Sequence, residues 1–244
     1  MRSRVLALSL LAPLLLVPAP SSAAPSSEKA GPAHHRPEVG ACYDYGVRGL
    51  NGLTGPKNEV SCDESHRAIT VAAPLIDADF SDREDPVIFE KAGARCYRAA
   101  YKAVGGTHEI RALTAYSIGY YVPTKAEIDK GARWVRCDLL LFGGERLMPL
   151  PDPYLPATPD DSVALCLVDQ YEAGTVCARD HKYRATGVVT IKGDDYPTDA
   201  RFDRIGQRRC DTRTTSDHYI WRWPNEQAWD AGKHLLTCYS RTRS

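Results

Sequence analysis

Two short stretches of the chain share one pattern, and this pattern decides the expected fold. The first is Val60-Ser61-Cys62-Asp63-Glu64-Ser65-His66, and the second is Val176-Cys177-Ala178-Arg179-Asp180-His181. In each stretch a His follows a Cys at a distance of four residues, and a strand-forming segment comes next. A repeated landmark of this kind indicates an internal duplication.

The landmarks that follow the two stretches keep nearly the same spacing. The next Cys lies 30 residues after His66 and 29 residues after His181. A Pro, a Gly and a Cys then span 14 residues in both halves: Pro123, Gly131 and Cys137 in the first, and Pro224, Gly232 and Cys238 in the second. The halves differ mainly in loop length, which surface loops tolerate. The sequence therefore predicts two copies of one module.

The charge balance limits the class of partner. The chain has 244 residues, enough for one or two domains, with 31 basic and 31 acidic residues. Residues 1–23 contain Arg2 and Arg4 and no acid, so the remainder has 29 basic and 31 acidic residues, a formal charge of −2. Binding to nucleic acid or to anionic lipid usually needs a basic face. We therefore expect no nucleic-acid partner.

Residues 1–23 are expected to be a signal peptide. Two Arg precede the apolar residues 5–17, and Ser21-Ser22-Ala23-Ala24 supplies small residues for cleavage after Ala23. The apolar run is shorter than the about 20 residues that span a bilayer, so we expect a secreted chain with no transmembrane helix after cleavage. Val39-Gly40-Ala41-Cys42 resembles a lipid-attachment box, but it lies far from the apolar run, and Cys42 fits the cysteine pattern better.

Eight Cys in an exported chain favour four disulfides. Their spacing alone leaves the pairing open, but a duplicated chain should repeat its pairing. In the second half, Leu165-Cys166-Leu167-Val168 and Thr175-Val176-Cys177 flank an expected turn, so two Cys should face each other on neighbouring strands. The favoured pairs are Cys42–Cys62, Cys96–Cys137, Cys166–Cys177 and Cys210–Cys238.

Zinc is the alternative use of these Cys and His. Each Cys-x-x-x-His lacks the paired-ligand spacing of zinc sites, and an oxidising compartment disfavours free thiolates. We therefore expect no metal and no cofactor.

The expected fold class is α+β. Two tandem similar modules are predicted, each a small, mostly antiparallel sheet with one longer and one short helix, stapled by disulfides. The first module is residues 39–146 and the second is residues 162–244. Residues 24–38 are expected to be a disordered tether, and residues 147–161, which hold five Pro, are expected to be a linker. The modules either share an interface or follow each other.

The longer helices have clear boundary signals. Asp85-Pro86 predicts the start of the first and Gly105-Gly106 its end. Helical spacing predicts that its inward face holds Ile88, Ala92, Cys96, Ala99 and Ala103. The counterpart is expected over residues 199–209, with Phe202, Ile205 and Cys210 inward. Thr124 and Glu127 form a capping-box pattern that starts a short helix.

Two groups of residues are candidates for binding. His66 and His181 occupy equivalent positions and could be ligands or proton-transfer groups; alternatively, each stabilises a turn through a hydrogen bond to the backbone. Tyr219, Trp221 and Trp223 alternate along an expected strand and could stack on sugar rings. Counting back from Pro224 in the second half and from Pro123 in the first gives their counterparts, which are Ile118, Tyr120 and Val122. Apolar residues in both halves favour core packing.

The chain resembles the actinobacterial septum formation family from residue 39 onward. The matching pieces are Val39-Gly40-Ala41-Cys42, Val60-Ser61-Cys62, His66, Cys96, Pro123-Thr124, Gly131 and Cys137, and in the second half Cys166, Cys177, His181, Cys210, Pro224, Trp229, Gly232 and Cys238. Asn225 departs from the family, which has Thr there. The resemblance implies a cell-envelope role linked to division in filamentous actinobacteria, and it implies no known enzymatic activity.

Two functions are consistent with these observations. The first is a non-catalytic envelope module that binds an envelope or division protein or a cell-wall glycan, with no catalytic residue. The expected location is extracellular, free or associated with the cell wall. The second is a secreted hydrolase that uses His66 or His181 as acid or base with a carboxylate such as Asp63 or Asp180.

Overall fold

The computed structural model describes residues 30–151, 158–170, 174–230 and 232–242. The expected signal peptide, residues 1–23, lies outside the described residues. No helix of the described residues is both long enough and apolar enough to cross a bilayer.

The first module is a five-stranded antiparallel sheet in the order β2-β1-β3-β5-β4. Its strands are β1 (Cys42–Tyr43), β2 (Glu59–Val60), β3 (Ala68–Ala72), β4 (Tyr116–Tyr121) and β5 (Arg136–Leu141). Its helices are η1 (Val47–Gly49), α1 (Pro86–Val104), α2 (His108–Ala112) and α3 (Lys125–Asp129). All six residues of β5 are buried, as a central strand covered on both faces requires.

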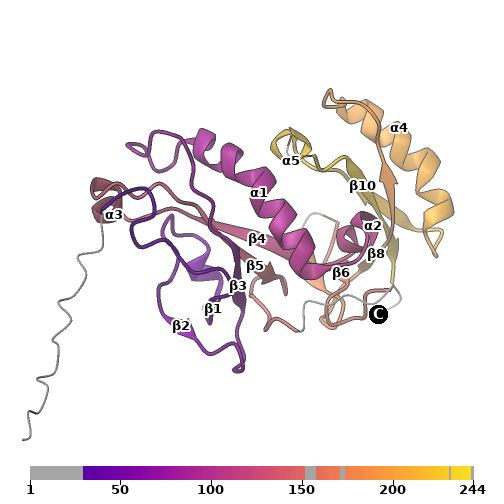
Figure 1. Ribbon diagram of the computed structural model, residues 1–244. Coiled ribbons are helices and arrows are strands. Elements are labelled where there is room, and N and C mark those ends of the chain that lie inside the picture. Colours follow the sequence, from indigo (N-terminus) through magenta and orange to yellow (C-terminus); the bar gives the residue numbers. More distant parts are fainter. Residues whose placement is uncertain (1–29, 152–157, 171–173, 231, 243–244) are drawn as a thin grey trace, which may run out of the picture.

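The second module repeats this sheet in the order β7-β6-β8-β10-β9. Its strands are β6 (Leu165–Leu167), β7 (Gly174–Val176), β8 (Tyr183–Thr190), β9 (Tyr219–Arg222) and β10 (Leu235–Arg241). Its helices are α4 (Asp199–Arg209), η2 (Asp211–Arg213) and α5 (Glu226–Asp230). Each strand has a counterpart at the same place in the first sheet, and α4 and α5 follow the pattern of α1 and α3 (Figure 1). The predicted α+β fold with two similar modules is confirmed.

Helix α1 has the predicted ends. The Asp85 side chain accepts from the backbone N–H of Val87, and Gly105 ends the helix with a φ of 76°. The buried face of α1 differs from the predicted face at its C-terminal end, where Ala100 and Val104 are buried in place of Ala99 and Ala103. The reason is tertiary: the last turns of α1 pack against residues of the second module.

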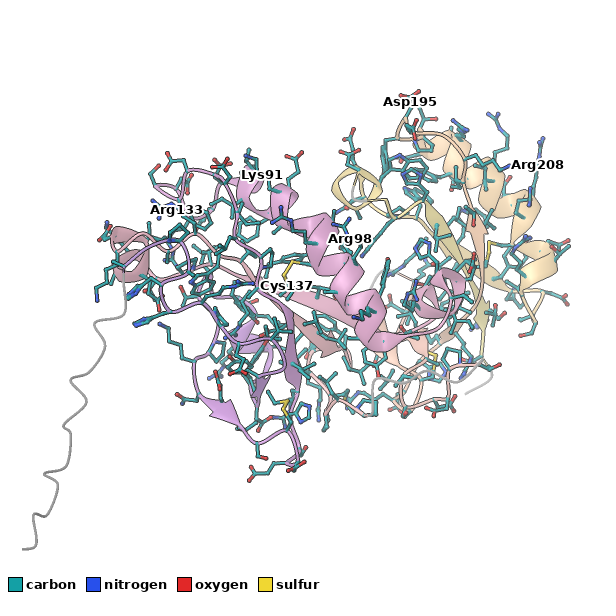
Figure 2. All side chains as sticks on the ribbon, in the orientation of Figure 1. Lys91, Arg98, Arg133, Cys137, Asp195 and Arg208 are labelled. Atoms are coloured by element: carbon teal, nitrogen blue, oxygen red, sulfur yellow. A yellow bond between two sulfur atoms is a disulfide. The ribbon has the colours of Figure 1, made fainter. Side chains whose placement is uncertain are left out.

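Four disulfides staple the modules, and they join the pairs that the duplication predicts. Cys96–Cys137 ties α1 to β5, and Figure 2 shows its sulfur atoms beside α1. Cys210–Cys238 ties the end of α4 to β10. Cys42–Cys62 and Cys166–Cys177 close the first hairpin of each module. In the strand register Cys166 opposes Thr175, so the second hairpin bond runs diagonally and not directly across.

Part of the expected tether is ordered. Residues 30–38 lie against the first module, where the Trp134 indole N–H donates to the carbonyl of His34 at 2.9 Å. Arg133 N–H donates to the carbonyl of Pro32, and His34 is buried. The prediction of disorder is therefore wrong for residues 30–38, because contacts with a distant Trp and Arg fix a segment whose own composition gives no structure.

The start of the expected linker is also packed. Leu147 is buried and forms a bridge with Phe142, and the N–H of Leu150 donates to the carbonyl of His66 at 2.8 Å. The prediction of a separate linker is wrong for these residues, since they continue the first module. Residues 152–157 of the linker lie outside the described residues.

The two modules share a hydrophobic core. We call it the shared cluster: Ala100, Val104, Ala115, Leu139 and Leu141 of the first module with Val163 and Val176 of the second. Main-chain hydrogen bonds reinforce it, from Ala115 N–H to Val163 at 2.9 Å and from Leu165 N–H to Leu113 at 2.8 Å. The modules therefore form one packed body, which settles the alternative that the sequence leaves open.

One buried polar network distinguishes the first module. Asp138 pairs with Arg136 at 3.0 Å, with side chains 0% and 5% exposed. Its carboxylate also accepts from Tyr45 at 3.0 Å and from Thr70 at 2.8 Å. The second module has Thr237 and Tyr239 at the positions that flank its equivalent Cys. The network is therefore not part of the common module.

Candidate functional site

The two predicted His have the same local geometry. Nδ1 of His66 lies 2.8 Å from the carbonyl oxygen of Glu64, and Nδ1 of His181 lies 2.7 Å from that of Arg179. A carbonyl can only accept, so each Nδ1 is the donor. Each imidazole thus closes the turn that follows the second Cys of its hairpin, as the structural alternative predicts.

The carboxylates that a hydrolase would need are not joined to these imidazoles. Asp63 and Asp180 are exposed on the same turns. Within the described ranges, the hydrogen bonds of the two imidazoles go to backbone carbonyls and none goes to a carboxylate. The geometry therefore gives no catalytic pair of the kind that acid–base chemistry needs.

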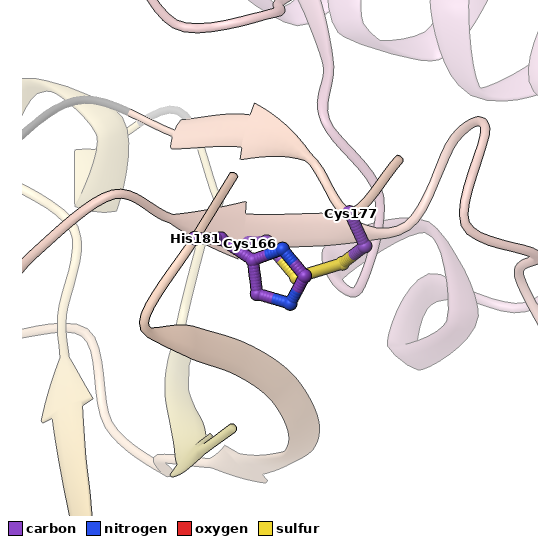
Figure 3. A group of neighbouring side chains, drawn as sticks. All are labelled: Cys166, Cys177 and His181. Carbon is purple, nitrogen blue, oxygen red and sulfur yellow. A yellow bond between two sulfur atoms is a disulfide. The ribbon is translucent and has the colours of Figure 1, made fainter. Parts of the chain in front are cut away.

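His181 also lies beside a disulfide. The ligand atoms of Cys166, Cys177 and His181 lie within 4.8 Å of one another (Figure 3). Of the described residues, this is the one group of three that meets the geometry for a metal ion. Both sulfur atoms form the disulfide, so the group offers no thiolate while that bond is intact.

The aromatic row of β9 and of the residue that follows it packs against the core beneath α4. Tyr219, Trp221 and Trp223 are all half-buried. The indole N–H of Trp221 donates to Asp203 of α4 at 3.1 Å, and the ring of Trp223 stacks on Phe202 with centroids 5.0 Å apart. This arrangement is the core packing that the comparison of the halves favours, and it leaves no open row of parallel rings.

A cleft between the modules is the strongest candidate site. It has a volume of about 440 Å³, within the range of ligand pockets. Residues of α1, α2 and β4 form one wall, and residues from β9 to β10 form the other. Figure 1 shows these elements facing each other, with α1 and α2 opposite α5 and β10. Of the aromatic row, Trp223 lines the cleft.

Cations and tyrosines line this cleft. The guanidinium carbon of Arg111 lies 4.4 Å from the ring centroid of Tyr101, and Lys233 Nζ lies 4.2 Å from that of Tyr97. Arg222 also lines the cleft, and its Nη2 donates to the carbonyl of Gln170 at 2.7 Å. The described residues that line the cleft include no Asp or Glu. The cleft is therefore positively charged.

The fourth basic group of the cleft is His108. Burial lowers the pKa of its imidazole, and the charges of Arg111 and Lys233 lower it further, against the opposing effect of Glu109. A charge of the second module therefore acts on a helix of the first. The cleft continues into a wider groove along α1 and β4, where Glu90, Glu226 and Asp230 also lie.

Most residues of the cleft are not predicted from the sequence. Tyr97 and Tyr101 are four residues apart on α1, one position to the side of the buried stripe, and this spacing is the one local signal. Arg111 and Lys233 come from opposite modules, and nothing in either half indicates that they meet.

The fold and the site define a disulfide-stapled α+β protein with a cationic cleft between two modules. The family model described as septum formation matches residues 39–238, so the chain belongs to this family. This membership supports a role related to cell division. The match covers both modules at once and does not identify either half as a separate family unit. No curated protein and no solved structure matches the chain.

Proposed function

We propose that the protein is exported to the cell envelope and acts in cell division as a non-catalytic binding module. Family membership supports the link to division. Four disulfides support an oxidising compartment outside the cytoplasm. The expected partner is an envelope or division protein, or a cell-wall glycan of the actinobacterial envelope.

One observation favours binding over catalysis. A cleft between the modules presents cations and tyrosines, whereas His66 and His181 lie on turns and donate to backbone carbonyls. Of the predicted aromatic set, Trp223 lines this cleft, which supports a binding role for that residue.

The test is a deletion strain complemented by tagged variants. Full-length protein should fractionate outside the cytoplasm and restore the spacing of septa, scored by membrane staining. A variant that lacks residues 1–23 should do neither. Normal septa in the deletion strain, or tagged protein retained in the cytoplasm, would contradict the proposal.

Partner capture separates the two functional classes. Tagged protein from cross-linked cells should retain a division protein or cell-wall fragments. The hydrolase alternative predicts turnover of wall substrates that disappears in His66→Ala or His181→Ala. Such turnover would replace the binding proposal with the catalytic one.

A further inference from the structure

The cleft holds three cations, and the described residues of its own lining include no acidic side chain. The adjoining groove is lined by Glu90, Glu226 and Asp230. Arg111, Arg222 and Lys233 are all half-buried. In the part of the chain that the structure describes, none of the three forms an ion pair. Removing charge from water is unfavourable unless an opposite charge is supplied. A bound anion would supply it.

The donors of Arg111 are only partly used. Its Nη1 donates to the carbonyl of Gly105 at 2.9 Å and to that of Gly106. Its Nε is buried and has no hydrogen-bond partner among the described residues. A buried donor without a partner is costly, and a planar guanidinium fixed on a tyrosine ring is suited to an oxyanion.

Lys233 brings a second charge from the other module. Its ammonium lies over the ring of Tyr97. The guanidinium of Arg111 lies over the ring of Tyr101, which is four residues after Tyr97 on the same helix. The two rings are 6.1 Å apart between centroids. An anion that enters the cleft therefore meets one cation from each module.

Part of the cleft wall is apolar. Ala100, Val104, Leu139 and Leu235 contribute to its walls, next to the ring of Trp223. These side chains can cover an apolar or aromatic group but cannot pair with a second charge. The volume of about 440 Å³ suits a small molecule or the end of a chain rather than a folded domain.

We propose that the cleft binds an oxyanion, carboxylate or phosphate, carried on an apolar or aromatic body, with Arg111 and Lys233 as its ligands. This inference rests on the proposed binding function and names the ligand class of its site. The anion bridges the two modules, and Tyr97 and Tyr101 hold the two cations in place.

Small aromatic probes test the charge requirement. Phenylacetate and phenyl phosphate are titrated into the purified chain, with calorimetry and Trp fluorescence as readouts. Neutral phenylacetamide has nearly the shape of phenylacetate. At least one anionic probe should bind, and phenylacetamide should bind at least about tenfold more weakly than phenylacetate if the carboxylate is the preferred anion. A preference for phenyl phosphate over phenylacetate assigns the ligand to the phosphate class.

Two variants and a control locate the site. Lys233→Gln should weaken binding of the anionic probe about tenfold, and Lys233→Arg should restore most of the affinity. Lys102→Gln removes an exposed cation of α1 outside the cleft and should leave the affinity unchanged. Circular dichroism checks that each variant is folded, so a loss of binding is not confused with unfolding.

Three results would overturn the inference. They are no binding of either anion at about 10 mM, equal binding of phenylacetamide and the anions, or unchanged affinity in Lys233→Gln. None of them bears on the septum assay, so the ligand class can fail while the division role stands. Abnormal export or normal septa would defeat the proposed function while leaving the binding result intact.

Discussion

Glu127 is the residue whose removal should show most clearly how the first module is held together. Its side chain is 6% exposed. One carboxylate oxygen accepts from Lys57 at 2.6 Å, and the other accepts from the N–H and the hydroxyl of Thr124 at 2.7 Å each. Nδ1 of His35 lies 3.4 Å from the first oxygen. Glu127 therefore joins the capping box of α3 to a loop and to residues 30–38.

These contacts favour the charged carboxylate. Burial alone would raise the pKa of Glu127, but hydrogen bonds from Lys57 and Thr124 outweigh it and lower the pKa from 4.5 to about 2. A lowered folded-state pKa adds stability above the unfolded-state pKa, and this stability is lost as the pH falls through the folded-state pKa. A shift of that size corresponds to about 3 kcal/mol at neutral pH.

The assay is urea unfolding of Glu127→Gln and the wild type at several pH values. The variant should be less stable by about 3 kcal/mol near pH 7, and the difference should shrink between about pH 4.5 and pH 2. The control is Asp129→Asn on the same helix. The carboxylate of Asp129 pairs with Lys125, and the side chains of Asp129 and Lys125 are 60% and 81% exposed, respectively. Exposed ion pairs contribute little to the free energy of unfolding, so the control should change stability by less than about 1 kcal/mol.

The result that would refute this reasoning is a difference between Glu127→Gln and the wild type that does not change with pH. Such a result would assign the effect to lost packing or lost capping rather than to the carboxylate charge. An equal loss in Asp129→Asn would refute it too, since burial would then have no bearing on the effect.

Three further predictions concern packing, a buried ion pair and the disulfides. Gly206→Ala should destabilise the protein by about 1–3 kcal/mol in urea unfolding, because a Cβ there would lie 2.4 Å from the indole ring of Trp221. The control Gly93→Ala, where a Cβ would meet nothing within 4 Å, should be neutral or stabilising by up to about 1 kcal/mol, and an equal loss of stability in both variants would contradict this prediction. Asp138→Asn should cost about 3–5 kcal/mol by the same measurement, because its buried arginine partner loses its counter-charge, and a loss below about 1 kcal/mol would argue against a tight ion pair. Limited reduction should open Cys42–Cys62 first, because Cys62 is exposed and the bonds that tie α1 and α4 to their sheets are buried. Alkylation of the released thiols followed by mass mapping checks the order, and a buried bond that opens first would contradict it.

Local signals in the sequence are enough to predict the elements. Asp85-Pro86 and Gly105 set the ends of α1, and the pairing of Thr124 with Glu127 forms the predicted capping box of α3. The duplication predicts the cysteine pairs because each module repeats the same order of strands. Helix α2 was not predicted, since five residues are too few to show a helical period.

The parts that sequence could not supply depend on contacts between distant residues. His34 is buried at a place where Trp134, a hundred positions later, donates to its carbonyl. The cleft brings Arg111 and Lys233 to the same cavity, beside a core to which both modules contribute. A pattern within one half cannot encode either arrangement.

The shared cluster has a consequence for whether either half can be produced alone. Because Val163 and Val176 fill a core whose other members come from the first module, cutting the chain near residue 150 would expose apolar surface on both pieces. Melting should then be one cooperative transition rather than two. Neither module is then an independent folding unit, and a substitution in the shared cluster should destabilise both.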